Sequence, residues 1–203
     1  MQNSPLTEKV REEFPILKRE IHGHPLAYLD NAATTQKPNC VIDALVNFYK
    51  KHNSNVSRGV YTLAEEATEI YEDGREIITK YIGAADSGKI IFSSGTTESI
   101  NLVASAWVQP NLKTGDRIMV TEMEHHSNLV PWQLVAQSCG AELVYWPLNP
   151  ESGNCSDGRL QLQKLDELLA QSVKLKQKVQ LLAVTAVSNV LGTVNPIVEI
   201  VKI

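Results

Sequence analysis

The sequence predicts an α/β fold built on a mostly parallel sheet with flanking helices. Along the second half of the chain, short apolar segments alternate with longer segments of helical period, and clusters of Gly, Asn, Asp and Ser separate them. The length of 203 residues suits one sizeable domain. The 43% hydrophobic and 21% charged residues are typical of a globular, water-soluble chain.

The first part of the chain is predicted to be mainly helical. A short amphipathic helix is expected within residues 6–20, and a brief strand is expected at 27–29. A proline can occupy the first turn of a helix that spans 38–51. Apolar residues at helical spacing predict a further helix over 62–82, and Gly83 fits its carboxy-terminal cap.

The remaining elements are predicted to alternate between strand and helix. Strands are expected at 89–92, 117–120, 142–146 and 179–184. Helices are expected at 96–107, 130–138 and 160–171. The segment 149–158 is rich in Asn, Ser, Gly and Asp, which predicts a surface loop.

Composition and charge exclude several classes of partner. A formal net charge of −4 provides no basic stripe for nucleic acid. No apolar run approaches the ~20 residues that span a bilayer, and the charged amino-terminal region is unlike a signal peptide. The three cysteines, Cys40, Cys139 and Cys155, lack metal-ligand spacing, so no metal site is expected. Unpaired thiols suit a reducing compartment, which predicts a cytoplasmic protein.

The first candidate site is a predicted strand-to-helix junction at Ser94-Gly95-Thr96-Thr97. The unpaired N–H groups and the positive dipole end of the helix can bind an anion there. The hydroxyls of Thr96 and Thr97 can add two donors to a phosphate. Ser and Thr also cap helices routinely, so a purely structural role is the alternative.

A second candidate follows the predicted strand 117–120, in the segment Glu124-His125-His126-Ser127-Asn128. In open α/β sheets, ligands gather beyond the carboxyl ends of the strands. An imidazole placed there can stack on an aromatic ring and can carry a proton. A structural histidine is one alternative, and a two-histidine metal site is another. Adjacent side chains point apart, so a site in which His125 and His126 bind one metal ion is the weaker interpretation.

Further candidates lie in loops. Asn189 follows the predicted strand 179–184, where an Asn usually serves turn formation. In the amino-terminal loops, Ala32 and Ala33 are small enough to let a loop close over a substrate. Arg58 stands beside Gly59 and could reach an anion, although an exposed Arg is the commoner case.

Four segments carry a resemblance to a known family. They are Tyr28–Pro38 (YLDNAATTQKP), Ser94–Asn101 (SGTTESIN), Glu122–Asn128 (EMEHHSN) and Val187–Pro196 (VSNVLGTVNP). In this order they resemble the amino-terminal half of a SufS/CsdA-type (group II) cysteine desulfurase of the class V aminotransferase family. The resemblance implies the large domain of the pyridoxal-phosphate (PLP) fold type I, here incomplete. An amino-terminal helical segment would span 1–25, and a partial PLP-binding domain would span 26–203.

The resemblance also assigns roles to the candidate residues. It implies that Thr96 and Thr97 hold the PLP phosphate, and that His125 stacks on the ring and handles protons as the catalytic histidine. It places Asn189 at both the cofactor and the substrate. The remaining residues at the substrate mouth would be Ala32, Ala33 and Arg58. Ser57 and Tyr61 stand where such enzymes usually or often have His, which puts substrate handling in question.

The implied reaction converts L-cysteine to L-alanine and leaves a persulfide on an enzyme cysteine. That sulfur would pass to an acceptor protein for iron-sulfur cluster assembly, and the family interface implies a homodimer. A selenocysteine lyase or another class V PLP enzyme is an alternative, because these motifs do not fix the leaving group. A non-catalytic module that pairs with a full-length desulfurase, or with a separate second half, is another.

The chemistry of the family also needs residues that the 203 residues lack. PLP enzymes use a Schiff-base lysine. The resemblance implies that this lysine follows a Ser-x-His motif, downstream of an Asp-x-x-Gln motif that supplies the partner of the ring nitrogen. Neither motif occurs in the sequence. None of the three cysteines matches the persulfide-forming position. We therefore expect a truncated or split part of the enzyme that is inactive alone, binds PLP weakly and exposes an apolar sheet edge or face.

Overall fold

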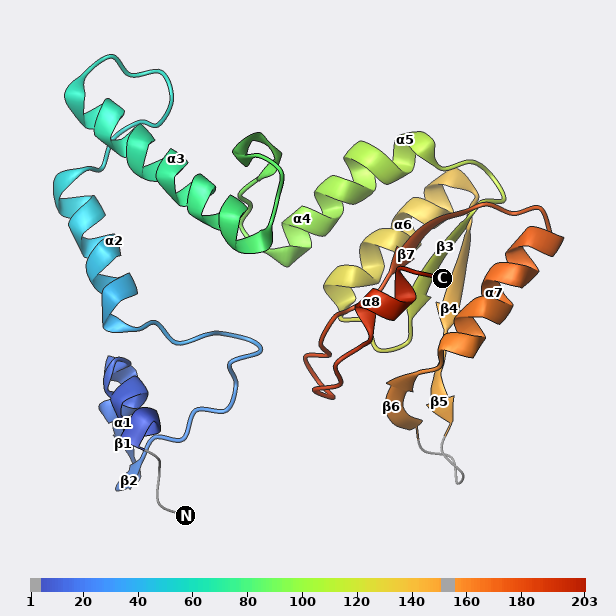
Figure 1. Cartoon of the computed structure of the whole chain (residues 1–203), viewed down its shortest axis with the longest axis horizontal. Helices are drawn as coiled ribbons and strands as arrows, with labels where there is room; N and C mark the ends of the chain where they lie inside the picture. Colours follow the sequence, from blue (N-terminus) through green and yellow to red (C-terminus); the bar gives the residue numbers. More distant parts are fainter. Residues whose placement is uncertain (1–4, 151–155) are drawn as a thin grey trace. The chain divides into compact units, whose positions relative to one another are not determined.

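The computed structural model describes residues 5–150 and 156–203 (Figure 1). The chain divides into two compact units, Met1–Ile91 and Phe92–Ile203. They are called the first unit and the second unit, and each has its own set of elements and contacts.

The first unit is mainly helical, as the sequence predicts. Its elements are α1 (Pro5–Glu12), η1 (Pro15–Lys18), β1 (Glu20–Ile21), β2 (His24–Pro25), α2 (Asn39–Lys51), α3 (Thr62–Ile82) and η2 (Ser87–Lys89). The strands β1 and β2 pair in an antiparallel hairpin. The helix expected within 6–20 is thus shorter than predicted, because the chain leaves the helix after Glu12 and Pro15 starts a separate 3₁₀ turn.

Specific polar contacts connect the elements of the first unit. The Arg11 guanidinium donates to the carbonyls of Leu17 at 2.9 Å and Leu26 at 2.8 Å. The Asn39 N–H donates to the Glu13 carbonyl at 2.8 Å, where α2 begins. Gly83 caps α3 with a φ of 69°, which confirms the predicted left-handed cap.

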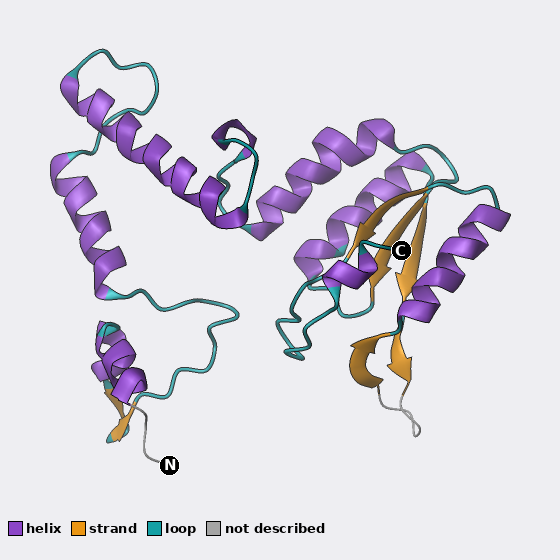
Figure 2. Cartoon of the chain, in the orientation of Figure 1, coloured by secondary structure: helices purple, strands orange, loops and turns teal. Residues whose placement is uncertain are grey.

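The second unit alternates helices and strands (Figure 2). Its first elements are α4 (Thr96–Val103), the π-helical turn η3 (Ala104–Val108), α5 (Gln109–Asn111), β3 (Arg117–Thr121), η4 (His126–Asn128), α6 (Val130–Cys139) and β4 (Glu142–Trp146). They are followed by β5 (Leu148–Pro150), β6 (Ser156–Leu160), α7 (Leu162–Lys174), β7 (Val179–Ala183) and α8 (Ile197–Ile200).

A three-stranded parallel sheet forms the centre of the second unit, in the order β4-β3-β7. All five residues of β3 are buried, because this strand is paired on both sides. The alternation of strand and helix that the sequence shows therefore produces the predicted α/β architecture. Parallel pairing requires a crossover between successive strands, and α6 and α7 supply these crossovers.

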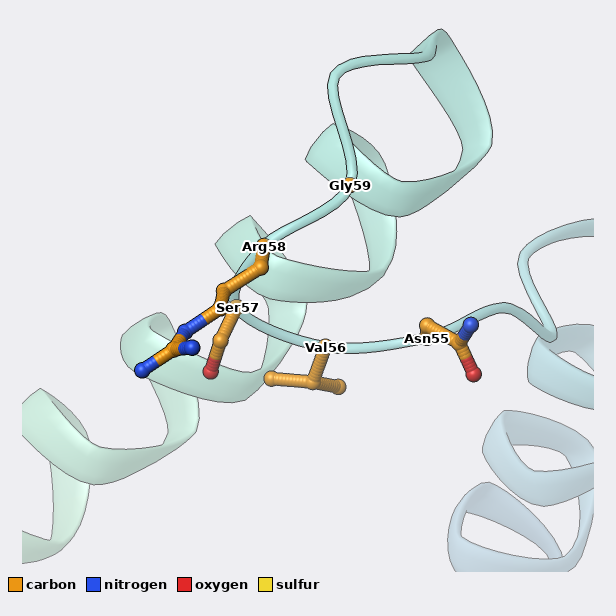
Figure 3. Close-up of a pocket in the computed structure, with 5 residues that line it drawn as sticks. All are labelled: Asn55, Val56, Ser57, Arg58 and Gly59. Atoms are coloured by element: carbon orange, nitrogen blue, oxygen red, sulfur yellow. The ribbon is translucent and has the colours of Figure 1, made fainter.

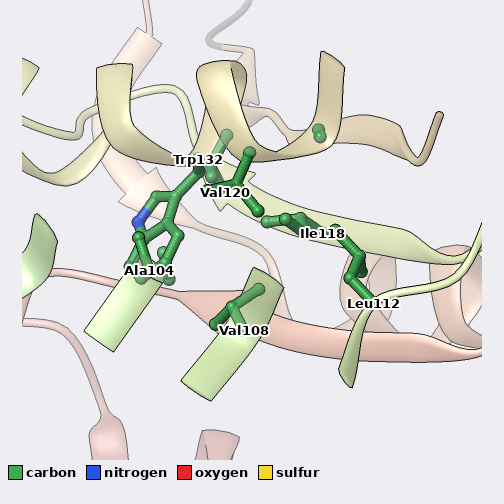
Figure 4. Packing of buried hydrophobic residues seen from close by; sticks show 9 residues of the cluster. Ala104, Val108, Leu112, Ile118, Val120 and Trp132 are labelled. Atoms are coloured by element: carbon green, nitrogen blue, oxygen red, sulfur yellow. The ribbon is translucent and has the colours of Figure 1, made fainter. Parts of the chain in front are cut away.

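Two apolar clusters cover the two faces of this sheet. Ile118 and Val120 point to a cluster that includes Val108 from η3 and Trp132 from α6 (Figure 4). Met119 points to the opposite face, in a second cluster with Trp146, Leu165 of α7 and Ile200 of α8. Successive residues of a strand face opposite sides. The second unit is consequently a three-layer α/β/α sandwich.

Two of the predicted strands do not form. Segments 27–29 and 89–92 pair with no strand within the described ranges. Leu29 is 93% exposed and Ile91 is 71% exposed. An apolar segment becomes a strand only where another strand accepts its hydrogen bonds, and neither segment has such a neighbour here.

The loop predicted at 149–158 is also corrected in part. Its flanks form the antiparallel pair β5–β6, with Leu148 opposite Leu160. Residues 151–155 lie outside the described ranges. The helix predicted to begin at 160 begins at Leu162 instead, because the preceding residues belong to β6. Asn149, Ser156 and Gly158 lie within these two strands although their residue types favour loops, which explains the error.

The second unit exposes apolar side chains in the loop after β7 and at its carboxyl end, outside the strands of the sheet. Val190 is 82% exposed, Val201 79% and Val194 74%. Over the described ranges, every helix is either too short or too polar to span a membrane. Those ranges also contain no group of three or more His, Cys, Asp and Glu that could hold a metal ion. Cys40 and Cys139 are free thiols, and Cys155 falls outside the described residues.

Candidate functional site

The candidate site of the second unit lies where its strands end. The loop 122–129 follows β3, and the loop 184–196 follows β7. These strands are parallel neighbours, so both loops leave the same edge of the sheet. Helix α4 packs against η4, the turn that directly follows His125. The start of α4 and both loops contain the four residues that the family resemblance assigns to the cofactor.

The turn before α4 depends on a glycine. Gly95 has φ 156° and ψ −178°, a backbone region that is essentially restricted to glycine. A Cβ at this position would meet no atom within 4 Å, so conformation rather than space requires the glycine. The Ser93 hydroxyl donates to the Gly95 carbonyl at 3.2 Å and lies 2.6 Å from the Ser99 hydroxyl.

Glu98 holds the other side of this turn. Its Oε2 accepts hydrogen bonds from the Ser94 hydroxyl at 2.6 Å and from the Ser94 N–H at 2.5 Å. These two bonds lower the pKa of the Glu98 carboxyl below its ordinary value, with the hydroxyl as the larger cause. Because folding lowers this pKa, the two hydrogen bonds stabilise the folded chain at pH values above the ordinary pKa of a glutamate. The stabilisation is lost as the pH falls through the lowered pKa.

The turn leaves donors free at the beginning of α4. Along α4, the first backbone N–H with an acceptor among the described residues is that of Ser99, which donates to the Gly95 carbonyl at 3.1 Å. The N–H groups of Thr96, Thr97 and Glu98 and the two Thr hydroxyls have no acceptor among them. Both threonines are exposed. Five donors therefore surround the positive end of a helix, an arrangement that suits a phosphate.

Replacement of Gly95 tests how firmly this turn is specified. We expect Gly95→Ala to lower the free energy of unfolding by about 1–3 kcal/mol, because alanine is strained in this backbone region. Urea unfolding followed by circular dichroism measures the change. Gly74→Ala is the control, since Gly74 lies inside α3 and a Cβ added there would meet nothing within 4 Å. That change should stabilise by up to about 1 kcal/mol. Equal effects of the two variants would contradict the assignment.

His125 is exposed, and its ring is oriented by the residue two positions later. The Ser127 N–H donates to His125 Nδ1 at 3.2 Å, and the Ser127 hydroxyl lies 2.9 Å from the same nitrogen. An N–H donor requires a lone pair on Nδ1, so the neutral ring carries its proton on Nε2. Nε2 is then the atom that can give or take a proton. The neighbouring His126 ring lies edge-on to the His125 ring, with the ring centroids 6.0 Å apart and an interplanar angle of 87°.

Glu124 is a connecting residue that was not predicted from the sequence. Its Oε1 accepts from the Thr121 hydroxyl at 2.6 Å and from the Thr185 N–H at 2.8 Å. Its Oε2 accepts from the Asn128 side-chain amide at 2.7 Å. The only signal in the sequence is an amide side chain four residues after the Glu. Thr185 is 61 residues away, and no local pattern indicates it.

Asn189 is exposed on a folded loop that follows β7. Val187 and Val194 form an isolated antiparallel bridge, and the Ser188 N–H donates to the Thr193 carbonyl at 2.9 Å. The buried Asn195 anchors the base, with its side-chain amide donating to the Thr185 carbonyl at 2.7 Å. Asn189 therefore lies in a turn, closed by the Gly192 N–H donating to the Ser188 carbonyl at 3.0 Å, within a loop whose base is anchored.

Three candidate residues belong to the first unit. Ala32 and Ala33 lie in an exposed turn, which the Tyr28 hydroxyl stabilises by donating to the Thr34 carbonyl at 2.7 Å. Arg58 is exposed and lines a pocket of about 510 Å³ formed by residues 55–59 (Figure 3).

The loop around Arg58 is closely packed against α3. A Cβ on Gly59 would overlap the Cβ of the fully buried Ala64. Ser57 has a positive φ of 91°, and its N–H donates to the Thr68 hydroxyl at 3.0 Å. Tyr61 bonds the Ser54 hydroxyl at 2.8 Å. Ser57 and Tyr61 stand where the resemblance leads one to expect His, and both form hydrogen bonds that fix this loop.

Comparison with known proteins now identifies the family. The family model described as "Aminotransferase class-V" matches residues 27–203. The chain belongs to the class V aminotransferase family. It is 51% identical to a cysteine desulfurase of Serratia proteamaculans over 193 residues, which are 95% of this chain and 45% of that protein.

Solved structures of class V members agree. The apo structure of a cysteine desulfurase from Thermococcus onnurineus has a TM-score of 0.82 and 35% identity, and the match covers 100% of this chain and 45% of that one. The cysteine desulfurase CsdA of Escherichia coli has a TM-score of 0.74 and 35% identity over 96% of this chain and 45% of that one. The chain thus spans about 45% of the length of these relatives. The resemblance to cysteine desulfurases and the predicted fold class are confirmed.

Proposed function

We propose that this chain supplies part of the cofactor site of a PLP-dependent cysteine desulfurase. The observation that carries the proposal is the set of free donors at the start of α4, where three N–H groups and two hydroxyls lack acceptors within the described residues. The relatives support it, since these similar proteins are named as cysteine desulfurases at 35–51% identity. The amino acid substrate would be L-cysteine.

The residues at the strand ends fit PLP by their chemistry. Thr96 and Thr97 would bind the phosphate through their hydroxyls and N–H groups, with the helix dipole adding to the attraction. PLP, when bound, draws electrons away from the α-carbon of the amino acid. His125 would lie against the ring and hold or move a proton at Nε2. Asn189 would contact the cofactor and the substrate from the loop after β7.

The remaining assignments concern the substrate mouth and the assembly. Ala32, Ala33 and Arg58 are proposed as residues that bind the substrate L-cysteine, as the family resemblance implies. The domain boundary near residue 25 fits the family match, which begins at residue 27. A second copy or a separate carboxy-terminal half, and a sulfur acceptor in iron-sulfur cluster assembly, are the proposed partners. The free thiols suit a cytoplasmic location.

Titration with PLP and with inorganic phosphate tests the cofactor assignment. We expect both ligands to shift the backbone N–H resonances of Thr96, Thr97 and Glu98 in the 203-residue chain. The double variant Thr96→Ala/Thr97→Ala should weaken phosphate binding about tenfold, because two hydroxyl donors at ~0.5–1.5 kcal/mol each are lost. Thr62→Ala is the control, since Thr62 is an exposed threonine at the start of α3.

The outcomes separate specific binding from reaction with surface lysines. If PLP modifies lysines but leaves the N–H resonances at the start of α4 unmoved, the cofactor assignment is wrong. If Thr62→Ala weakens phosphate binding as much as the double variant does, the helix that binds phosphate is α3 and the assignment is equally wrong.

A further inference from the structure

The half-buried carboxylate of Glu124 joins three segments of the second unit. Its three acceptor contacts reach Thr121 at the end of β3, Asn128 in η4 and Thr185 after β7, at 2.6–2.8 Å. No ion pair to Glu124 is among the salt bridges of the described residues. Its oxygens are thus occupied by neutral donors that belong to three different parts of the chain.

One arm of this network fixes the turn that carries His125. Asn128 donates to Glu124 Oε2, and its own Oδ1 accepts the Trp132 indole N–H at 3.0 Å. Trp132 is 3% exposed in the core between α6 and the sheet. The His125 turn is therefore tied to a buried side chain through two consecutive hydrogen bonds.

The other arm fixes the base of the loop that carries Asn189. Glu124 Oε1 accepts the Thr185 N–H, and the Thr185 carbonyl accepts from Asn195 at the opposite end of the loop. Asn195 also donates to the Ala186 carbonyl at 2.9 Å through its N–H. The carboxylate thus lies at the start of both loops.

We infer that Glu124 is a positioning residue that holds His125 and Asn189 in a fixed relation for contact with the cofactor ring. This inference rests on the proposed function and adds a residue to it. Among the described residues, the hydrogen bonds of Glu124 go to Thr121, Asn128 and Thr185 and not to Thr96 or Thr97, so we expect phosphate binding at the start of α4 to be independent of Glu124. Binding of the ring and binding of the phosphate are consequently separable.

The network requires a carboxylate rather than an amide. Every partner of Glu124 is a donor, and a carboxylate only accepts. In Glu124→Gln, the NH₂ group would face the Thr185 N–H if it replaced Oε1, or the Asn128 amide if it replaced Oε2. Rotating Asn128 to present its oxygen would place its NH₂ against the Trp132 N–H. The variant must therefore lose at least one bond while keeping almost the same volume.

Nuclear magnetic resonance of the whole chain tests the connection. In Glu124→Ala we expect hydrogen exchange at the Thr185 N–H to rise by about 10- to 100-fold, the ratio that accompanies loss of a bond to a charged acceptor. In Glu124→Gln the Trp132 indole N–H should shift, while the Trp146 indole N–H, which donates to the Gln161 carbonyl, should not. Glu122→Gln is the control, because that exposed carboxylate accepts one backbone N–H, from Leu148.

Ligand binding tests the functional part of the inference. Glu124→Ala should weaken PLP binding about tenfold, because His125 and Asn189 would no longer be held for contact with the ring, at a loss on the order of one hydrogen bond. The affinity for inorganic phosphate should be unchanged. The variant should also reduce the response of His125 and Asn189 resonances to PLP. Unchanged Thr185 exchange, or an unchanged ratio of PLP to phosphate affinity, would overturn the inference. A parent chain whose α4 resonances ignore both ligands would instead overturn the proposed function, while the Thr185 and Trp132 measurements would still report on Glu124.

Discussion

Supplied with PLP, L-cysteine and a thiol reductant, the 203-residue chain on its own is expected to release neither alanine nor sulfide. The reason is chemical: the sequence has no Ser-x-His motif before a lysine and no Asp-x-x-Gln motif, and the family resemblance places the anchoring lysine and the ring-nitrogen partner in those motifs. A single proton-transferring histidine contributes only about 10²- to 10⁴-fold in rate. Assays of alanine and sulfide, with borohydride reduction followed by mass spectrometry, measure the result.

Complementation of the chain with a second polypeptide provides a test in which activity is expected. A polypeptide carrying the second half of a related enzyme should restore turnover, and His125→Ala should then lower it by about 10²- to 10⁴-fold. His126→Ala is the matched control, because His126 is the adjacent exposed histidine and the proposed function gives it no role. Turnover by the isolated chain, with one lysine labelled stoichiometrically, would show that a lysine outside the expected motif anchors the cofactor.

The sequence predicted the central sheet well, because burial leaves a direct pattern. The residues of β3 are all buried, and the segment 117–120, apolar at 118–120, indicated that strand to within one residue. Pairing leaves no such pattern. The segments 27–29 and 89–92 have the composition of strands, yet Leu29 is almost fully exposed because no other strand lies beside it within the described ranges. Whether an apolar segment becomes a strand depends on a neighbour that is often distant in sequence.

The candidate site was predictable where its chemistry is local. The donors at Thr96 and Thr97 follow from a small residue and two hydroxyls at the beginning of a helix, which can be read over four positions. The role of Glu124 could not be read in this way, because its contact with Thr185 spans 61 residues. Asn189 falls between these cases. Its position after a strand was evident, whereas the anchoring of its loop by Asn195 required the fold.

Trp132→Ala is expected to cause a large loss of stability in the second unit. The side chain is 3% exposed and packs with Val108, Val120 and Ala104 in the cluster that joins α6 to the sheet. Truncation of a buried aromatic residue typically costs about 3–5 kcal/mol, compared with a total of ~5–15 kcal/mol for a typical domain. Urea unfolding followed by circular dichroism measures the change. Trp107→Ala should cost no more than about 1 kcal/mol, because Trp107 is 50% exposed.

Trp132→Phe separates the packing of this residue from its hydrogen bond. Phenylalanine keeps an aromatic ring in the core but removes the N–H, which leaves the half-buried Asn128 Oδ1 without its donor. An unsatisfied acceptor of this kind costs about 1–3 kcal/mol, so the variant should fall between the parent and Trp132→Ala. The Asn128 side-chain amide would then keep its hydrogen bond to Glu124 but lose the one that ties it to the core. We therefore expect Trp132→Phe to raise exchange at the Asn128 side chain while leaving the Thr185 N–H protected. Faster exchange at Thr185 would show instead that the two arms of the Glu124 network do not act independently.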